Sequence, residues 1–118
     1  MVRVVSFGFK YGEPYPVADM RLDLRRRLRN PQDQVPKGAV GTDNVVVSAV
    51  LGTAENRKVL QRYYERARMQ ARSQAEFVIA FGCKSGIHRS VVFANEIAAR
   101  LLNDGHEVEV EHLHLRES

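Results

Sequence analysis

The chain has little cysteine and no long apolar run, and each scarcity removes a class of protein. Cys83 is the only cysteine in 118 residues, which excludes an internal disulfide framework and a thiolate zinc cluster. No apolar run approaches the roughly 20 residues that a membrane-spanning helix needs. The N-terminal residues 1–5 are too short a stretch, and too soon polar, for a signal peptide. These features predict a cytoplasmic protein with no membrane partner.

The residues that are present are typical of one modest globular domain. Hydrophobic residues make up 44% of the chain and charged residues 27%, the usual range for globular proteins. A chain of 118 residues can bury one core but not two, so we expect a single domain over residues 1–118. The net charge of +4 mildly favours phosphorylated or nucleic-acid partners.

The hydrophobic pattern predicts strands and helices in alternation. Four segments are expected to be strands, two from runs of β-branched and aromatic residues (Val2–Phe7 and Phe77–Phe81) and two from alternation of polar and apolar residues (Asp19–Arg25 and His106–Leu113). Two segments with helical spacing of apolar residues are expected to be helices: Thr53 to about Ser73, and Arg89–Asn103. Segment Val45–Leu51 fits a short helix capped by Thr42 or Asp43, and fits a strand equally well.

Helices placed between the later strands imply an α/β fold. A strand that is followed by a helix and then by another strand usually returns parallel to the first. We therefore predict a three-layer domain with a mostly parallel sheet of about four strands and flanking helices. Functional loops in such folds gather at the carboxyl ends of the strands.

Segment 76–90 joins a predicted strand to a predicted helix through a tight loop. Such a junction points free backbone N–H groups and the positive end of the helix dipole at one spot, which favours anion binding. Cationic and hydroxyl side chains gather there, and the candidate ligands of an anion are Lys84, Ser85, Gly86, His88, Arg89 and Ser90. The sequence thus predicts a phosphate site at the start of the helix.

The same loop also fits Cys-x-x-Gly-x-x-Arg-Ser, the pattern of cysteine-dependent phosphatases. Cys83 would then attack phosphorus while Arg89 holds the phosphate. Against this alternative, Gly82 stands where those enzymes usually carry histidine, and neither Asp19 nor Asp43 is clearly placed as a general acid. A small, buried and inert cysteine is the other interpretation of Cys83.

A second pattern extends in order over nearly the whole chain. Its parts are Ser6-Phe7-Gly8-Phe9-Lys10-Tyr11-Gly12, Asp19-x-x-x-Asp23-x-Arg25, Asn30-Pro31, Gly41-x-Asp43, Gly82-Cys83-x-x-Gly86-x-His88-Arg89-Ser90-Val91 and His112. Together they resemble the C-terminal domain of the RapZ family of RNase adapter proteins. The Phe-Gly-Phe-Lys and Gly-Cys-x-x-Gly-x-His-Arg-Ser motifs are quite specific to it.

The resemblance implies a sheet similar to half of a phosphofructokinase. It also implies a non-catalytic regulatory domain that binds glucosamine-6-phosphate and contacts small RNAs. It places Asp19 and Arg25 near the sugar, and it assigns a phosphate loop made of Cys83, Ser85, Gly86, His88 and Arg89. Larger relatives carry a Walker-type nucleotide-binding domain first, so the resemblance implies a stand-alone version here.

The remaining candidates lie in the first loop and on the basic surface. Lys10 and Tyr11 lie between Gly8 and Gly12, which suggests a close backbone approach to a ligand. The run Arg25–Arg29 and the basic side chains of the long helix suit either a solvated surface or an RNA footprint. No cofactor is expected, and no metal, since the histidines lack metal spacing. Expected partners are a phosphorylated sugar or other phosphate metabolite, RNA or an RNase, and further copies of the chain.

Overall fold

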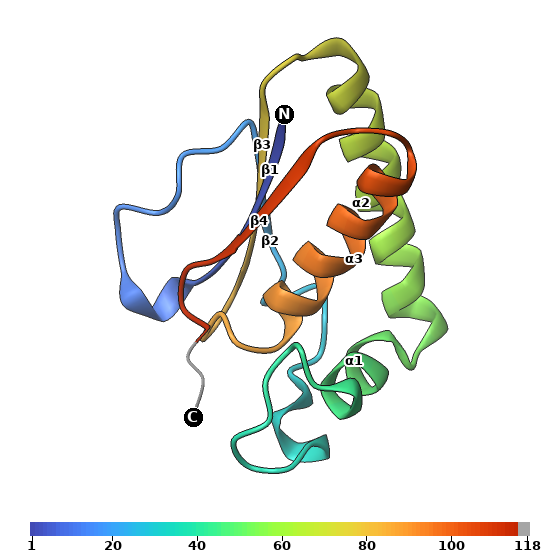
Figure 1. Ribbon diagram of the computed structural model, residues 1–118. Helices are drawn as coiled ribbons and strands as arrows, with labels where there is room; N and C mark the ends of the chain where they lie inside the picture. The colour runs from blue at the N-terminus through green and yellow to red at the C-terminus, as the bar shows by residue number, and fades with distance from the viewer. Residues whose placement is uncertain (116–118) are drawn as a thin grey trace.

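Residues 77–83 form a central strand in the computed structural model of the protein, which describes residues 1–115 (Figure 1). The elements in chain order are β1 (Val2–Gly8), the 3-10 turn η1 (Phe9–Tyr11), β2 (Met20–Asp23), the 3-10 turn η2 (Pro31–Gln34), α1 (Asn44–Leu51), α2 (Ala54–Ser73), β3 (Phe77–Cys83), α3 (Arg89–Asn103) and β4 (Val108–His112). The predicted α/β fold is confirmed, and the ends of the four strands differ from the predicted ends by two residues at most.

All four strands are parallel and lie in the order β2-β3-β1-β4. The step from β1 to β2 runs in one direction across the sheet, and the steps from β2 to β3 and from β3 to β4 run in the other. Because parallel crossovers are right-handed, opposite directions place the connections on opposite faces. All three α-helices therefore cover one face, and loop 9–19 crosses the other (Figure 1).

The two faces have cores of different sizes. The main cluster packs α1, α2 and α3 against the helix-facing side chains of the sheet, among them Val4, Ile79 and Phe81. On the other face Phe9, Tyr15 and Ala18 pack over a small cluster made of Val5, Phe7 and Ala80. The third layer is thus a loop and not a helix, because Gly12, Pro14 and Pro16 interrupt any helical run there.

Segment 44–51, which the sequence left open between helix and strand, is a helix. Val46 and Val50 are spaced by one helical turn, and both are buried. Asp43 occupies the N-cap position, but its carboxylate accepts from the backbone N–H of Val40 (2.8 Å) and makes no capping bond. In the next helix, α2, the Thr53 hydroxyl does accept from the backbone N–H of Asn56 (3.1 Å), as a cap should.

The fold brings the ends of β1 and β3 together at one edge of the sheet. Gly8 and Cys83 are register partners at the carboxyl ends of these adjacent strands. The chain leaves β1 toward the loop-covered face and leaves β3 toward the helix-covered face. Such a switch point is where ligands bind in open α/β sheets. Within residues 1–115, no helix is both long and apolar enough to cross a membrane.

Candidate functional site

Two loops contact each other backbone to backbone at this edge. Lys10 donates its backbone N–H to the carbonyl of Lys84 (3.0 Å). Gly86 adopts a φ of +75°, and a Cβ there would lie 2.6 Å from the backbone nitrogen of Gly8 and 2.7 Å from the carbonyl carbon of Phe7. Only glycine fits this conformation and this distance. The loop after β1 and the loop after β3 therefore form one continuous structure.

Arg89 begins α3 with its side chain buried, at 4% exposure. Its Nη1 donates to the backbone carbonyls of Arg25 (3.3 Å) and Leu28 (3.0 Å). Its Nε is buried and has no hydrogen-bond partner. No carboxylate of the described residues lies within ion-pair distance of its guanidinium. Buried charges are normally paired, so this guanidinium lacks an acceptor that its position calls for.

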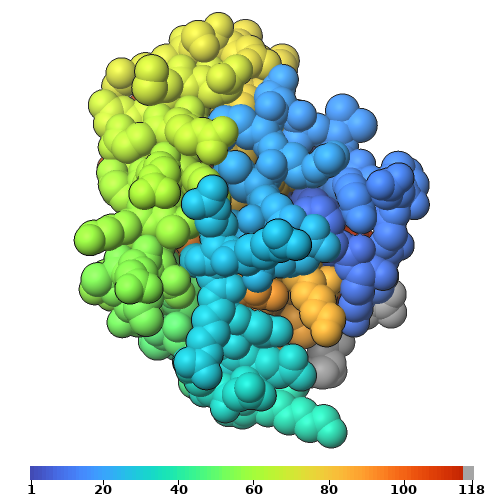
Figure 2. Space-filling view, turned by 180° about the vertical axis from the view of Figure 1, so that it is seen from behind, coloured from blue at the N-terminus to red at the C-terminus, as the bar shows by residue number. Residues whose placement is uncertain are grey.

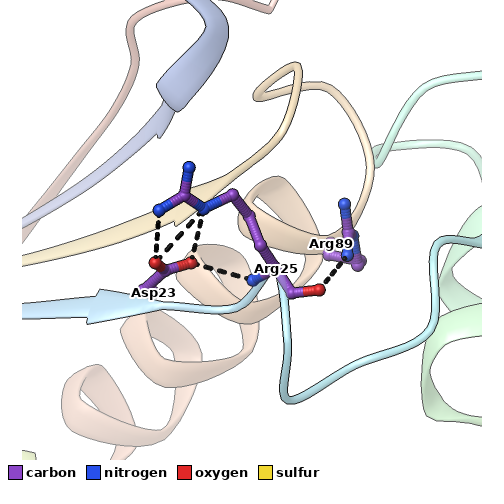
Figure 3. A network of polar contacts seen from close by, with 3 residues as sticks. All are labelled: Asp23, Arg25 and Arg89. Carbon is purple, nitrogen blue, oxygen red and sulfur yellow. Dashed lines mark hydrogen bonds and ion pairs between the residues drawn. The ribbon is translucent and has the colours of Figure 1, made fainter.

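Arg25 contributes to the site through its backbone and not through its side chain (Figure 3). Its guanidinium pairs with the Asp23 carboxylate (2.7 Å) and lies 3.8 Å from the centre of the Phe9 ring. The hydrogen bond from Arg25 is the largest cause of a lowered pKa at Asp23. Arg25 thus presents its carbonyl to Arg89 while its own charge is already compensated.

Cys83 lies below the loop and is 2% exposed. Its thiol donates to the Ser90 hydroxyl (3.1 Å), and its sulfur accepts from the backbone N–H of Gly86 (3.3 Å). Ser90 is itself fully buried. These contacts fix the shape of the loop between β3 and α3.

A cavity of about 670 Å³ opens beside Arg89. One wall comes from segment 83–89, a second from segment 10–11 together with His114, and a third from segment 30–40. Of the predicted site residues, the ones that line it are Lys10, Tyr11, Cys83, Ser85, His88 and Arg89. The fold therefore gathers six candidates from two distant parts of the chain around one space.

Histidine side chains join the walls of this cavity. The Nε2 of His88 lies 2.7 Å from the carbonyl of Ala39 and so connects segment 30–40 to the loop after β3. The Gly8 backbone N–H donates to Nδ1 of His114 (2.8 Å), and the His114 ring stacks on Tyr11 with 4.0 Å between ring centres. His88 thus bonds the third wall to the first, and the contacts of His114 hold the second wall together.

Five predicted residues do not line the cavity. Gly86 and Ser90 shape the loop between β3 and α3, and the other three lie away from the cavity or face away from it. Lys84 is exposed and does not line the cavity, and the Arg25 side chain is occupied as described. Asp19 lies at the amino end of β2, at the opposite edge of the sheet. There its carboxylate accepts from the backbone N–H of Val78 (2.8 Å) and from the Gln74 amide (2.9 Å). We therefore leave the side chains of these three residues out of the site.

His112, which belongs to the family-like pattern, lies between β1 and α3. Its Nδ1 is 2.6 Å from the Ser6 hydroxyl, and its Nε2 is 2.9 Å from the Asn95 side-chain oxygen. Burial lowers the pKa of His112 below its ordinary value. Its position indicates that it fixes β4 to the rest of the fold.

Sequence reasoning missed the third wall. Segment 30–40 contains none of the predicted site residues, yet its polar and charged residues line the cavity: Asn30, Gln32, Asp33 and Lys37. The pairs Asn30-Pro31 and Gly41-x-Asp43 in the family-like pattern, which bracket this segment, were the available signal. Within residues 1–115, no group of three or more histidine, cysteine or acidic side chains is arranged to hold a metal ion.

Known proteins resemble this chain along its length. A nucleotide-binding protein of Heliobacterium modesticaldum is 32% identical to it over 117 residues, which is 94% of this chain and 38% of that protein. Nucleotide-binding proteins of Clostridium novyi and Thermobifida fusca are 36% and 38% identical, covering 99% and 92% of this chain and 41% and 38% of their own lengths.

The chain spans about two fifths of the length of these curated relatives. The model of the RapZ C-terminal domain family matches residues 1–116. That match agrees with the Gly86 and Arg89 loop and with the glycine-bracketed loop after β1, both described above. The chain therefore belongs to the RapZ C-terminal domain family.

Proposed function

We propose that this domain is a regulatory, non-catalytic module of the cytoplasm that binds a phosphorylated sugar such as glucosamine-6-phosphate. The observation that carries the proposal is the buried Arg89, whose Nε has no partner at the wall of a cavity. Burying a guanidinium without a carboxylate is costly. A bound oxyanion would supply both the missing charge and the missing acceptor.

The remaining donors of Arg89 suit a phosphate. Its Nη1 is used by two carbonyls, which leaves the edge formed by Nε and Nη2 without a partner among residues 1–115. That edge offers two parallel N–H groups, which match two phosphate oxygens. The start of α3 adds a positive helix dipole, and Ser85 and Lys10 line the same cavity.

The rest of the cavity suits the sugar. Its volume of about 670 Å³ leaves room beside a phosphate, and its lining includes Asn30 and Gln32, whose side chains are amides. Amides can donate to and accept from sugar hydroxyls.

Calorimetry with glucosamine-6-phosphate tests the phosphate site. Arg89→Ala should weaken binding at least tenfold, because each charge-assisted hydrogen bond lost costs about 1.5–3 kcal/mol. Arg89→Lys keeps the charge but removes the planar fork, and it should also weaken binding. Arg26→Ala is the matched control, since this exposed arginine lies outside the cavity. If both Arg89 variants fold and bind like the wild type, the proposal fails.

A second candidate function is that of an RNA-binding adapter that also engages an RNase. Its support is a basic surface: Figure 2 shows segment 25–29 and α2 side by side on one face of the molecule. Exposed cationic side chains on these segments include Arg26, Arg27, Arg29, Lys58, Arg62, Arg66 and Arg72. Binding through phosphate contacts predicts a steep loss of RNA affinity with added salt. Salt-independent binding would contradict this function.

The phosphatase alternative has less support. A nucleophile needs access to phosphorus, whereas Cys83 is buried and its sulfur is already engaged with Ser90 and Gly86. These contacts favour a structural role for the thiol within a binding site.

A further inference from the structure

The charged residues of the cavity are not all cationic. Lys10, Lys37 and Arg89 bring positive charge to its walls, whereas Asp33 is the one carboxylate among the described residues that line it. Asp33 is exposed, and its carboxylate makes no hydrogen bond or ion pair with any residue of segment 1–115. It is thus an unpaired negative group in a space that otherwise attracts anions.

The chain holds Asp33 in a defined turn. Asp33 belongs to η2, where the Asn30 side-chain oxygen accepts from the Gln32 backbone N–H (3.1 Å) and Pro31 is buried. The bond between His88 and Ala39 keeps the following part of this wall against the loop after β3. Asp33 and Arg89 line the same cavity from different walls.

The placement of Asp33 has an electrostatic cost for simple anions. A carboxylate that shares a cavity with a phosphate repels it, and so weakens the binding of every phosphorylated ligand that carries no positive charge. When the ligand also carries a protonated amine, Asp33 attracts the ligand, because the amine can pair with the carboxylate while the phosphate pairs with the guanidinium.

We infer that Asp33 is a specificity-determining residue that selects phosphorylated ligands carrying a protonated amine, by pairing with that amine opposite Arg89. The inference rests on the proposed function, because it takes the phosphate to lie at Arg89. It adds a second charged contact from segment 30–40, which no feature of the phosphate loop supplies.

A plainer role for Asp33 makes a different prediction. An acidic residue in the first turn of a short helix stabilises that turn slightly. Removal of its charge would then change the melting temperature, and it would change the affinities for all sugar phosphates equally. The ratio of two affinities separates this role from selection.

Glucosamine-6-phosphate and glucose-6-phosphate are matched probes, because they differ only in an amine against a hydroxyl. Calorimetry should show that the wild type prefers the amino sugar by about tenfold. Asp33→Asn should reduce this preference to within about twofold, and it should bind glucose-6-phosphate at least as tightly as the wild type does. Glu13→Gln is the control, since Glu13 lines a smaller neighbouring cavity and not this one, and it should keep the full preference.

Two results would overturn the role of Asp33 and leave the phosphate site standing: equal wild-type affinities for the two probes, both dependent on Arg89, or an unchanged preference in Asp33→Asn. Failure of the wild type to bind either probe would instead remove the phosphate site, and this inference with it.

Discussion

The two edges of the parallel sheet differ in how completely their polar groups are satisfied. At the amino edge, the Asp19 carboxylate accepts hydrogen bonds from Val78 and Gln74, and the N-terminal amine donates to the carbonyl of Ala75 (2.8 Å). At the carboxyl edge, Arg89 is buried with an unpartnered Nε beside a cavity. Buried polar groups are nearly always paired, so this exception distinguishes the carboxyl edge and supports the proposed phosphate site there.

Chain segments pack closely at the carboxyl edge. At the carboxyl edge a Cβ on Gly8 would lie 2.5 Å from the carbonyl carbon of Ser85, and one on Gly41 would lie 2.5 Å from the Cβ of Val91. The glycines here allow three chain segments to meet around α3. Close backbone packing fixes the cavity walls before a ligand arrives, which reduces the ordering cost of binding.

The largest expected effect comes from breaking this close approach. Gly86→Ala should lower the free energy of unfolding by about 3 kcal/mol, because the added methyl would meet backbone atoms of Phe7 and Gly8 at a φ that disfavours L side chains. Urea denaturation measures the change.

Gly12→Ala provides the control for backbone strain alone. Gly12 has a similar φ of +79°, but a Cβ there would meet no heavy atom within 4 Å. Gly12→Ala should therefore lower the free energy of unfolding by only about 1 kcal/mol. Equal decreases in the free energy of unfolding at the two positions would show that the contact between the two loops does not stabilise the fold.

A smaller effect is expected at Cys83, which lies on the same edge as Arg89 but has hydrogen-bond partners for its thiol. Cys83→Ser should cost about 1 kcal/mol of stability, since the serine hydroxyl keeps the polar contacts with a shorter reach. Binding of glucosamine-6-phosphate should stay within about twofold of the wild type. An aryl phosphate assay accompanies the titration: wild-type turnover that Cys83→Ser abolishes would establish the phosphatase and contradict the non-catalytic proposal.

Local sequence signals were enough to predict the loop between β3 and α3. The apolar run, the glycine and the helical spacing that follows all lie within segment 76–103, so the junction could be predicted without tertiary contacts. The state of Arg89 could not be predicted in this way. It depends on carbonyls 64 and 61 residues away in sequence, and its burial depends on the packing of that distant segment.

Strand direction explains why Asp19 and Arg25 separate. The resemblance placed both near the sugar, yet they flank a single strand, β2, and so lie at opposite edges of a parallel sheet. A pattern of motifs preserves order along the chain but carries no information on which end of a strand faces a ligand. The third wall was missed for a related reason: Pro36 and Gly38 signal an irregular segment but not the surface on which it packs.

The smallest expected effect tests the amino edge, where Asp19 should serve stability and not binding. The backbone N–H of Val78, followed by the Gln74 amide, lowers the pKa of Asp19 below its ordinary value of 3.8. The ionised carboxylate therefore stabilises the fold at pH values above 3.8, and this contribution is lost as the pH falls through the lower, folded-state pKa.

Asp19→Asn should reduce the melting temperature near neutral pH, and the difference in melting temperature from the wild type should close in acid. Because Asp19 lies at the far edge from Arg89, the affinity of the variant for glucosamine-6-phosphate should not change. A tenfold loss of affinity at unchanged stability would place a ligand contact at the amino edge and end the distinction between the two edges.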